Sequence, residues 1–285
     1  MKFVAKYKIG PLYTPPVVSK IDGPLGTLML PSAGGGTNWA GGSFDPETHI
    51  LYVYSQTTPS SLGLVPAPEG NDFGWVSGSA ATAARGAGAG AAGRAGGGGR
   101  GAAAPAAGRG AAAAAPAAAP AAAPAAGRGA APAAAPEGGG GGGLTIQGLP
   151  LIKPPYGRIT AINMDRGEFV WQVAHGETPD NIRNHPLLKG MNVPRTGQSG
   201  IVGTLVTKTL VIAGDRAVTT TDDHPRGAML RAYDKATGKE MASVFMPSSQ
   251  SGSPMTYMLN GKQYIVIAIG GGNYPSEFMA FRLPG

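Results

Sequence analysis

The stretch ITAINMDRGEFVW, residues 159–171, carries the pattern that decides the fold. An apolar run leads to Asn163, Gly167 closes the polar part, and a second apolar run starts directly after it. The side chain of Asn can accept hydrogen bonds from the backbone of a tight turn, and Gly takes the positive-φ position that such a turn needs. The stretch therefore predicts two strands joined by a short turn.

The same pattern returns in LRAYDKATGKEMA, residues 230–242, at an offset of 71 residues. Asn163 then aligns with Asp234, and Gly167 aligns with Gly238. Asp can start such a turn for the same reason as Asn. The offset predicts a repeated hairpin.

A second kind of unit consists of small residues followed by a strand, a turn and another strand. It occurs in residues 200–214 and 253–271, and more loosely in residues 38–55. When the two kinds alternate, they make antiparallel meanders of four strands, which are the signature of β-propeller blades. At roughly 40–50 residues per blade, the chain holds about four blades. We predict an all-β fold, a β-propeller of four-stranded antiparallel blades, with a short helical turn within residues 178–190.

A low-complexity segment interrupts these units. From Ser77 to Gly143 the sequence is almost entirely Ala, Gly and Pro, with five Arg and one Glu. Such a composition cannot bury enough apolar area to offset the entropy of ordering. We predict propeller blades in residues 1–76, a disordered insertion in residues 77–143, and further blades in residues 144–285.

The charge of the chain does not indicate a nucleic-acid partner. The net charge is +7, and the insertion contributes more than half of it. Its Arg-Gly spacing is an alternative indication of RNA binding, but the segment has no aromatic side chain on which bases could stack. We expect no nucleic-acid partner.

The cysteine content excludes several kinds of site, and the N-terminal residues do not resemble a signal peptide. The chain has no Cys, which excludes disulfides, thiolate metal sites and Cys nucleophiles. The first residues, MKFVAKYKIGPLYTPP, have no apolar core of signal-peptide length, and no apolar run of membrane-spanning length follows. As written, the chain carries no export signal.

Several motifs in order resemble one protein family. They are PPYGRITAINMDRGEFVWQV (154–173), GTLVTKTLVIAG (203–214), LRAYDKATGKE (230–240) and GSPMTYMLNGKQYIVIAIGGG (252–272). These motifs are similar to the C-terminal half of the quinoprotein dehydrogenases, which are propellers that bind pyrroloquinoline quinone (PQQ). Among these enzymes the match looks closest to the membrane-bound glucose dehydrogenase branch.

The resemblance implies a fold, a reaction and partners. The family fold is an eight-bladed propeller with PQQ on its axis and a calcium ion beside it, and an aspartate acts as the base. The enzymes oxidise a sugar or alcohol hydroxyl in the periplasm and pass the electrons to ubiquinone or a cytochrome. A metal Lewis acid and a carboxylate base suit the removal of a hydride from a carbon that bears a hydroxyl.

The resemblance assigns cofactor contacts to two short segments. Asn38 stands at the start of an axis-lining strand and would donate its amide to the cofactor, with a plain turn-capping role as the alternative. Trp39 beside it could wall the pocket or lie between blades. Gly200 and Ile201 take the corresponding place in a later blade. Alcohol-oxidising relatives often have Trp at the position of Ile201, so an aliphatic residue there favours sugars or polyols.

Other polar residues are assigned to turns or solvent. The loop TTTDDHPRG, residues 219–227, could supply hard-metal ligands but is predicted to be a solvated turn. His175 and His185 match no helical metal spacing, and Asp45 and Asp234 are turn residues first. We therefore predict no catalytic residue and no metal ligand in this chain.

The family's catalytic aspartate and calcium ligands belong to a part of the propeller that the matched motifs do not cover. The chain is therefore expected to be the C-terminal part of the enzyme, inactive alone, with the missing N-terminal half of the propeller as its partner. Half a propeller would leave strand edges and blade faces open. The alternative is a non-catalytic propeller scaffold that binds protein partners.

Overall fold

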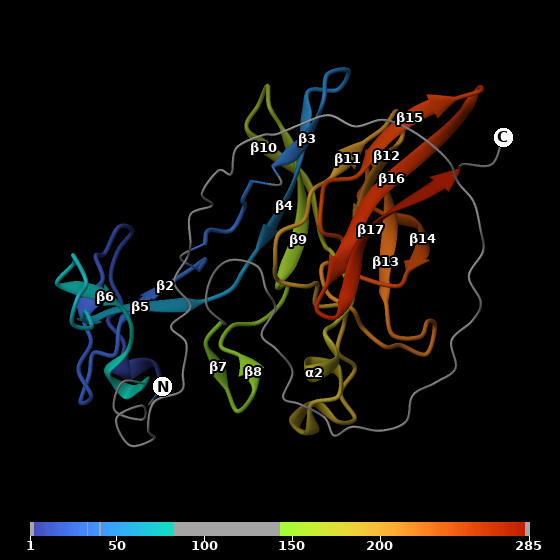
Figure 1. The fold of residues 1–285 in the computed structure, drawn as a ribbon. Helices are drawn as coiled ribbons and strands as arrows, with labels where there is room; N and C mark the ends of the chain where they lie inside the picture. The colour runs from blue at the N-terminus through green and yellow to red at the C-terminus, as the bar shows by residue number, and fades with distance from the viewer. Residues whose placement is uncertain (1–2, 33, 40, 83–142, 283–285) are drawn as a thin grey trace, which may run out of the picture.

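The structure is a computed structural model that describes residues 3–32, 34–39, 41–82 and 143–282 (Figure 1). Most of the predicted insertion, residues 83–142, lies outside these described residues. Its predicted disorder therefore stays a prediction.

The first blade is assembled from both sides of the insertion. It consists of β3 (Gly42–Asp45), β4 (Ile50–Gln56), β9 (Gly157–Asn163) and β10 (Glu168–Ala174), in the order β10-β9-β4-β3. All neighbouring pairs are antiparallel. The connection from β4 to β9 thus leaves the blade halfway and returns to complete it. We call this sheet blade 1.

The second blade is continuous in sequence. It contains β11 (Leu205–Val206), β12 (Leu210–Gly214), β13 (Ala228–Asp234) and β14 (Glu240–Met246), paired in sequence order and antiparallel. This sheet is blade 2. It is the four-stranded meander that the repeats predict.

The third sheet has three strands in the described part of the chain. They are β15 (Met255–Leu259), β16 (Lys262–Gly271) and β17 (Tyr274–Arg282), again antiparallel and in sequence order. This sheet is blade 3. Its strands β16 and β17 are the longest of the described sheets.

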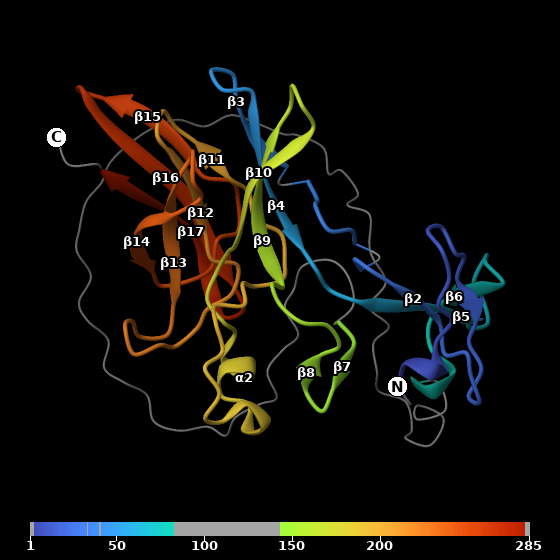
Figure 2. The same ribbon diagram turned by 180° about the vertical axis from the view of Figure 1, so that it is seen from behind.

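The N-terminal strands do not form a blade. Strands β1 (Val17–Val18), β2 (Thr27–Met29) and β6 (Trp75–Ser77) are short and all belong with β5 (Ser60–Pro66), which pairs in parallel with β1. Figures 1 and 2 show this sheet to one side of the three blades. Pro and Gly punctuate the N-terminal sequence and keep its strands short. The predicted count of about four blades is therefore too high for the described residues.

The remaining elements are small. A hairpin of β7 (Thr145–Ile146) and β8 (Leu149–Pro150) follows the undescribed segment. Helix α2 (Asp180–Arg183) and the 3₁₀ turn η2 (Pro186–Leu188) confirm the helical turn predicted within residues 178–190, and η1 (Val4–Lys6) is a further 3₁₀ turn. No helix in the described ranges is long and apolar enough to cross a membrane.

The two repeated turns have the predicted geometry. Asn163 Oδ1 accepts hydrogen bonds from the backbone N–H groups two and three residues later, at 3.0 and 2.9 Å. Asp234 Oδ1 accepts one from the N–H three residues later, at 2.8 Å. Gly167 and Gly238 have φ of 68° and 72°. The repeated hairpin predicted from the 71-residue offset is confirmed as β9–β10 and β13–β14.

The core consists of two layers between the blades. Tyr52, Ile159 and Val211 are buried between blades 1 and 2, and Ile212 and Ile267 are buried between blades 2 and 3. Val211 and Ile212 are neighbours in β12, so their side chains point to opposite faces of the sheet and enter different layers. Blade 2 is therefore the middle of a face-to-face stack.

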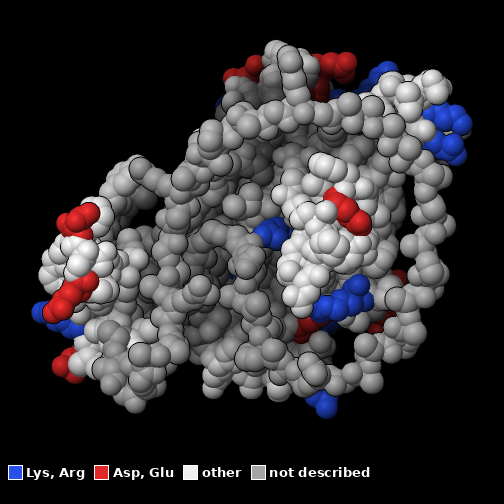
Figure 3. Space-filling model, viewed as in Figure 1, with Lys and Arg blue, Asp and Glu red and all other residues white. Residues whose placement is uncertain are grey.

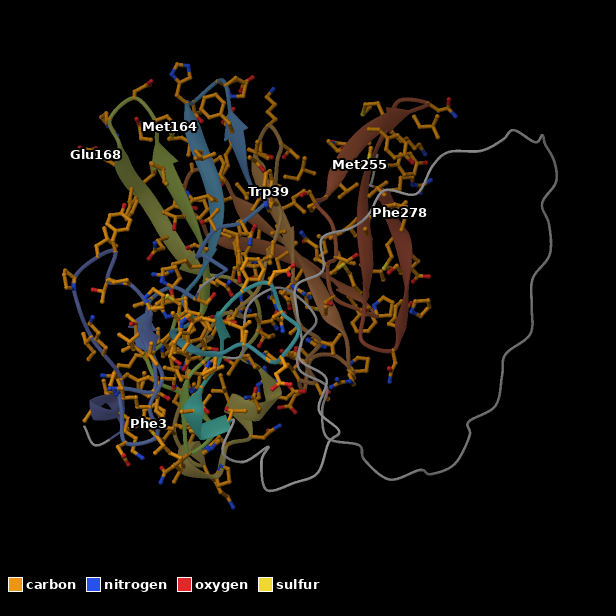
Figure 4. All side chains as sticks on the ribbon, turned by 60° about the vertical axis from the view of Figure 1, so that its left-hand side comes forward. Phe3, Trp39, Met164, Glu168, Met255 and Phe278 are labelled. Atoms are coloured by element: carbon orange, nitrogen blue, oxygen red, sulfur yellow. The ribbon has the colours of Figure 1, made fainter. Side chains whose placement is uncertain are left out.

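Both ends of the stack are apolar and open in the described part of the chain. On blade 1, Phe44 and Phe169 lie on the face opposite the core and are 49% and 71% exposed. On blade 3, Met255 and Phe278 are 52% and 81% exposed, and Figure 4 shows both at the outside of the stack. Exposed apolar patches of this kind mark surfaces that another protein segment covers.

Candidate functional site

The predicted site residues lie on segments that lead into the blades. Residues 34–39 lead into blade 1, residues 196–204 lead into blade 2, and residues 248–254 lead into blade 3. We call these three the lead-in segments. The first two carry all four predicted cofactor contacts.

Asn38 organises its own lead-in segment. Its Nδ2 donates to the carbonyl oxygen of Gly34 at 3.1 Å, and its Oδ1 accepts from the backbone N–H of Trp39 at 2.7 Å. The oxygen is therefore used locally, and one of the two amide hydrogens remains for another acceptor. Asn38 can contribute at most one donated hydrogen bond to a ligand without leaving this arrangement.

Trp39 is 98% exposed. Figure 4 shows its side chain projecting from the start of blade 1 rather than into the core. An indole of this size gains most by covering its flat faces. Trp39 therefore does not pack between the described blades, and its ring is open to a flat ligand or to another polypeptide.

Gly200 adopts a backbone conformation that favours glycine, and the side chain of Arg216 packs against it. Its φ is 140°, and a Cβ there would lie 2.3 Å from Cγ of Arg216. Its backbone N–H donates to Gln56 Oε1 at 2.9 Å. Ile201, the next residue, is half-buried. The lead-in segment of blade 2 thus has a bare backbone followed by an aliphatic side chain.

Gln56 brings the two segments together. In addition to accepting from Gly200, its Nε2 donates to the carbonyl oxygen of Gly35 at 3.2 Å, and its backbone N–H donates to that of Gly36 at 2.8 Å. The end of β4 therefore holds the lead-in segments of blades 1 and 2 against each other. The hairpin pattern did not reveal Gln56, because it lies beyond the last residue of the pattern.

A repeated tripeptide supports the same region. Gln-Ser-Gly occurs at residues 198–200 and again at 250–252. Gln198 is buried and forms two hydrogen bonds with the backbone of Ala217, at 3.1 and 2.9 Å, and Gln250 is buried and bonds the backbones of two glycines. Each Gln side chain accepts a hydrogen bond from one backbone N–H and donates one to a backbone carbonyl, and so joins neighbouring segments. The repeat itself, 52 residues apart, is the signal that could have identified them from sequence.

His175 is buried between blades and has both ring nitrogens engaged. Nε2 lies 3.0 Å from the carbonyl oxygen of Gly214, which can only accept, so Nε2 is the donor. Nδ1, 2.8 Å from the hydroxyl of Tyr233, then accepts. Burial lowers the pKa of His175 and raises the pKa of Tyr233. The pair is therefore neutral and structural.

The other polar residues considered from sequence stand apart from the lead-in segments. His185 caps η2 through Nδ1 and donates from Nε2 to the carbonyl oxygen of Gln147 at 2.8 Å. In the loop of residues 219–227, Asp222 and Asp223 are exposed, and His224 is buried with Nδ1 bonded to the neighbouring carbonyl. Across the residues that the structure describes, no group of three or more His, Cys, Asp or Glu could hold a metal ion.

A buried ion cluster fixes the connection between blades 1 and 2. Arg231 donates to both carboxylate oxygens of Asp215 at 2.7 and 3.0 Å, to Glu240 at 2.9 Å and to Glu177 at 3.4 Å. Burial alone would lower the pKa of Arg231, but the pairing with Asp215 outweighs it and the pKa is raised. The cluster lines a cavity of about 90 Å³ and is charge-paired throughout.

Charges on the visible surface are mixed. On the face in Figure 3, acidic and basic side chains of the described residues are interspersed. This arrangement is typical of a solvated surface rather than of a phosphate-binding stripe.

Comparisons with known proteins place these observations in a family. A family model described as "PQQ: Glucose/ethanol/alcohol dehydrogenase, beta-propeller domain" matches residues 1–265. The chain is 35% identical over 150 residues to a probable quinate dehydrogenase (quinone) of Xanthomonas campestris pv. juglandis, covering 50% of this chain and 17% of that protein. It is 30% identical over 146 residues to quinoprotein glucose dehydrogenase A of Acinetobacter calcoaceticus, again 50% and 17%.

Among solved structures, a quinohemoprotein alcohol dehydrogenase from Pseudomonas putida HK5 matches 86% of this chain and 23% of its own. The TM-score is 0.44 and the identity is 17%. The chain spans about a sixth of the length of the two curated relatives.

Proposed function

Because the chain belongs to the PQQ-dependent glucose/ethanol/alcohol dehydrogenase β-propeller family, we propose that it is part of an enzyme that oxidises a sugar or alcohol hydroxyl and passes the electrons to a quinone or a cytochrome. The family that the motifs resemble and the β-propeller class predicted from the repeats are both confirmed by the match across residues 1–265. That match is the observation that carries the proposal. The names of the relatives, a quinate and a glucose dehydrogenase, support a substrate that bears hydroxyl groups.

The described residues fit a flat cofactor in part. Trp39 offers an uncovered ring, and Asn38 keeps one amide hydrogen free of its local bonds. Gly200 brings the backbone close to the same region, although the side chain of Arg216 packs against it and its N–H bonds Gln56. We propose that these three and Ile201 form one side of the PQQ site. When bound, PQQ supplies the two-electron acceptor that no amino-acid side chain provides.

The base and the calcium ligands are proposed to come from outside this chain. The exposed apolar faces of blades 1 and 3 suit further blades. We propose that an N-terminal propeller half covers those faces and supplies both the aspartate and the calcium site. The whole enzyme is proposed to work in the periplasm, as the resemblance implies.

A PQQ titration tests the proposal. We expect the chain alone neither to bind PQQ tightly nor to reduce an artificial electron acceptor, and the chain assembled with its N-terminal half to do both. In that assembly, Trp39→Ala should weaken PQQ binding roughly tenfold, because a stacked aromatic contributes about 1–1.5 kcal/mol.

Trp75→Ala is the matched control. Trp75 lies on β6, away from the lead-in segments, and is also well exposed. It should leave PQQ affinity unchanged. Strong acceptor reduction by the chain alone would remove the need for the other half, and an assembled protein without PQQ binding would refute the function.

A further inference from the structure

The three lead-in segments contain no charged side chain. Residues 34–39, 196–204 and 248–254 consist of Gly, Ser, Thr, Asn, Gln, Trp, Ile, Val and Pro. PQQ, the cofactor of the proposed function, is a polyanion because its rings carry carboxylate groups. A carboxylate that leaves water needs hydrogen-bond donors, and a positively charged donor binds it more strongly than a neutral one. A cation beside these segments would supply that partner.

Arg216 brings a positive charge to the lead-in segment of blade 2. Its side chain lies so close to Gly200 that a Cβ on Gly200 would be 2.3 Å from Cγ and 3.1 Å from Nε of Arg216. The backbone N–H of Gly200 is already bonded to Gln56. At this point the segment therefore offers a ligand the guanidinium group beside the glycine rather than the backbone of the glycine itself.

The backbone on both sides of Arg216 is held in place. On one side, Gln198 accepts from the N–H of Ala217 at 2.9 Å and donates to its carbonyl oxygen at 3.1 Å. On the other side, the N–H and the carbonyl oxygen of Asp215 are bonded to backbone groups of neighbouring segments, at 2.8 and 3.0 Å. Because the start of the Arg216 side chain is fixed against Gly200, less conformational entropy is lost when the side chain binds a ligand.

The carboxylate next to Arg216 in the sequence is engaged elsewhere. Both oxygens of Asp215 accept from Arg231, at 2.7 and 3.0 Å, and Asp215 is fully buried. The charge of Arg216 acts on the end of β4: burial raises the pKa of Tyr54, and the positive charge of Arg216 opposes that rise. An arginine has several N–H donors, so Arg216 can bind a carboxylate in addition to its contacts within the chain.

We propose that Arg216 binds a carboxylate group of the cofactor beside Gly200. This inference rests on the proposed function, since it names a residue that would hold the anionic edge of the cofactor. A guanidinium group can meet a carboxylate through two parallel N–H···O bonds, which fix the orientation of the ligand as well as its affinity. Gln198 contributes indirectly, because it holds the residue after Arg216.

Nuclear magnetic resonance of the isotope-labelled full chain tests the contact. Two probes share one ring system: PQQ with its carboxylates, and the PQQ trimethyl ester, in which the carboxylates are blocked. We expect PQQ to shift the side-chain Nε–H signal of Arg216 and the N–H signal of Gly200 with a Kd of about 1 mM, since the chain alone offers one side of the site. We expect the ester to leave the Arg216 signal unchanged.

Variants at Arg216 measure the contribution of the charge. Arg216→Gln should weaken PQQ binding about tenfold through loss of a charge-assisted hydrogen bond, and should leave binding of the ester unchanged. Arg216→Lys should lie between the two, because an ammonium group keeps the charge but not the paired N–H groups. Arg226→Gln is the matched control, since Arg226 lies in the loop of residues 219–227 and its side chain is 69% exposed. It should bind PQQ like the unmodified chain.

The outcomes separate this inference from the proposed function. Absence of a PQQ-induced shift at Arg216, equal PQQ affinity in Arg216→Gln and the unmodified chain, or an equal loss in Arg226→Gln would overturn the contact. An ester that shifts Arg216 as PQQ does would also overturn it. Failure of PQQ to bind the chain assembled with its N-terminal half would instead overturn the proposed function.

Discussion

Gln56 is the residue on which the candidate site depends most directly. One side chain contacts the lead-in segments of two blades, through Gly35 and Gly200. Its Nε2 bonds the segment that leads into blade 1, and its Oε1 bonds the segment that leads into blade 2. The relative position of the proposed cofactor contacts is therefore set by a residue that need not touch the cofactor.

Replacing Gln56 with Leu should loosen this arrangement. We expect faster hydrogen exchange at the Gly200 amide, whose acceptor is lost, and PQQ binding to the assembled protein weakened by about tenfold. Gln172→Leu is the control, because Gln172 also donates one side-chain bond, to Thr160, but within blade 1. If Gly200 exchanges equally fast in both variants, Gln56 has no special positioning role.

Asp45 shows how a turn residue becomes part of the core. Its carboxylate accepts from Lys235 at 2.6 Å and from Thr48 at 2.6 Å, and it joins the turns of blades 1 and 2. These hydrogen bonds, that of Lys235 first, lower the pKa of Asp45 below 3.8.

A pH dependence of stability follows from Asp45. Because the folded pKa lies below the unfolded one, the contribution is present above about pH 4 and is lost as the pH falls through the folded value. Asp45→Asn should therefore flatten the loss of stability on acidification. Urea unfolding midpoints at a series of pH values from neutral to acid measure this, and parallel pH profiles for the two proteins would contradict it.

At the scale of the element, the hairpins could be predicted from sequence, but the strands with which they pair could not. Asn163, Asp234 and the following glycines determine the β9–β10 and β13–β14 turns locally, so sequence was sufficient for them. The pairing of β4 with β9 bridges the insertion, and the parallel pairing of β1 with β5 joins distant residues. Such pairings depend on the whole chain. Of the candidate site, the lead-in positions were proposed from the resemblance and stay a prediction, whereas the contacts of Gln56 emerged only when the chain was folded.

The two repeated glycines offer a matched test of turn and packing. Both have positive φ, but a Cβ on Gly238 would lie 2.7 Å from the ring of Trp171, while one on Gly167 meets nothing within 4 Å. Gly167→Ala should cost about 1 kcal/mol for the left-handed backbone. Gly238→Ala should cost at least about 1 kcal/mol more through overpacking. Equal losses in urea unfolding would show that the Trp171 contact is without consequence.

The whole molecule is an open stack of blades with unlike ends. Phe169 lies on the end face of blade 1 and Phe278 on that of blade 3, and both are largely exposed. No segment among the described residues covers them, and these faces should pair with each other in solution, because burial of apolar surface favours association.

Phe278→Glu should reduce this self-association. Light scattering of the chain alone should show a smaller mean mass for Phe278→Glu than for the unmodified chain. Phe73→Glu is the control, since Phe73 is 73% exposed but lies outside the three blades. If both variants associate equally, the end face of blade 3 is not the contact.

The division of blade 1 also sets the order in which the chain can fold during synthesis. β4 is finished at Gln56, but its neighbour β9 begins only at Gly157. At roughly 5–20 residues per second, the ribosome needs roughly 5–20 s to make the intervening stretch. Throughout that interval the growing chain carries a β3–β4 hairpin with one unpaired edge. Synthesis of the insertion thus delays the pairing of β4 with β9. During this delay the free edge of β4 is open to chaperones or to a neighbouring chain.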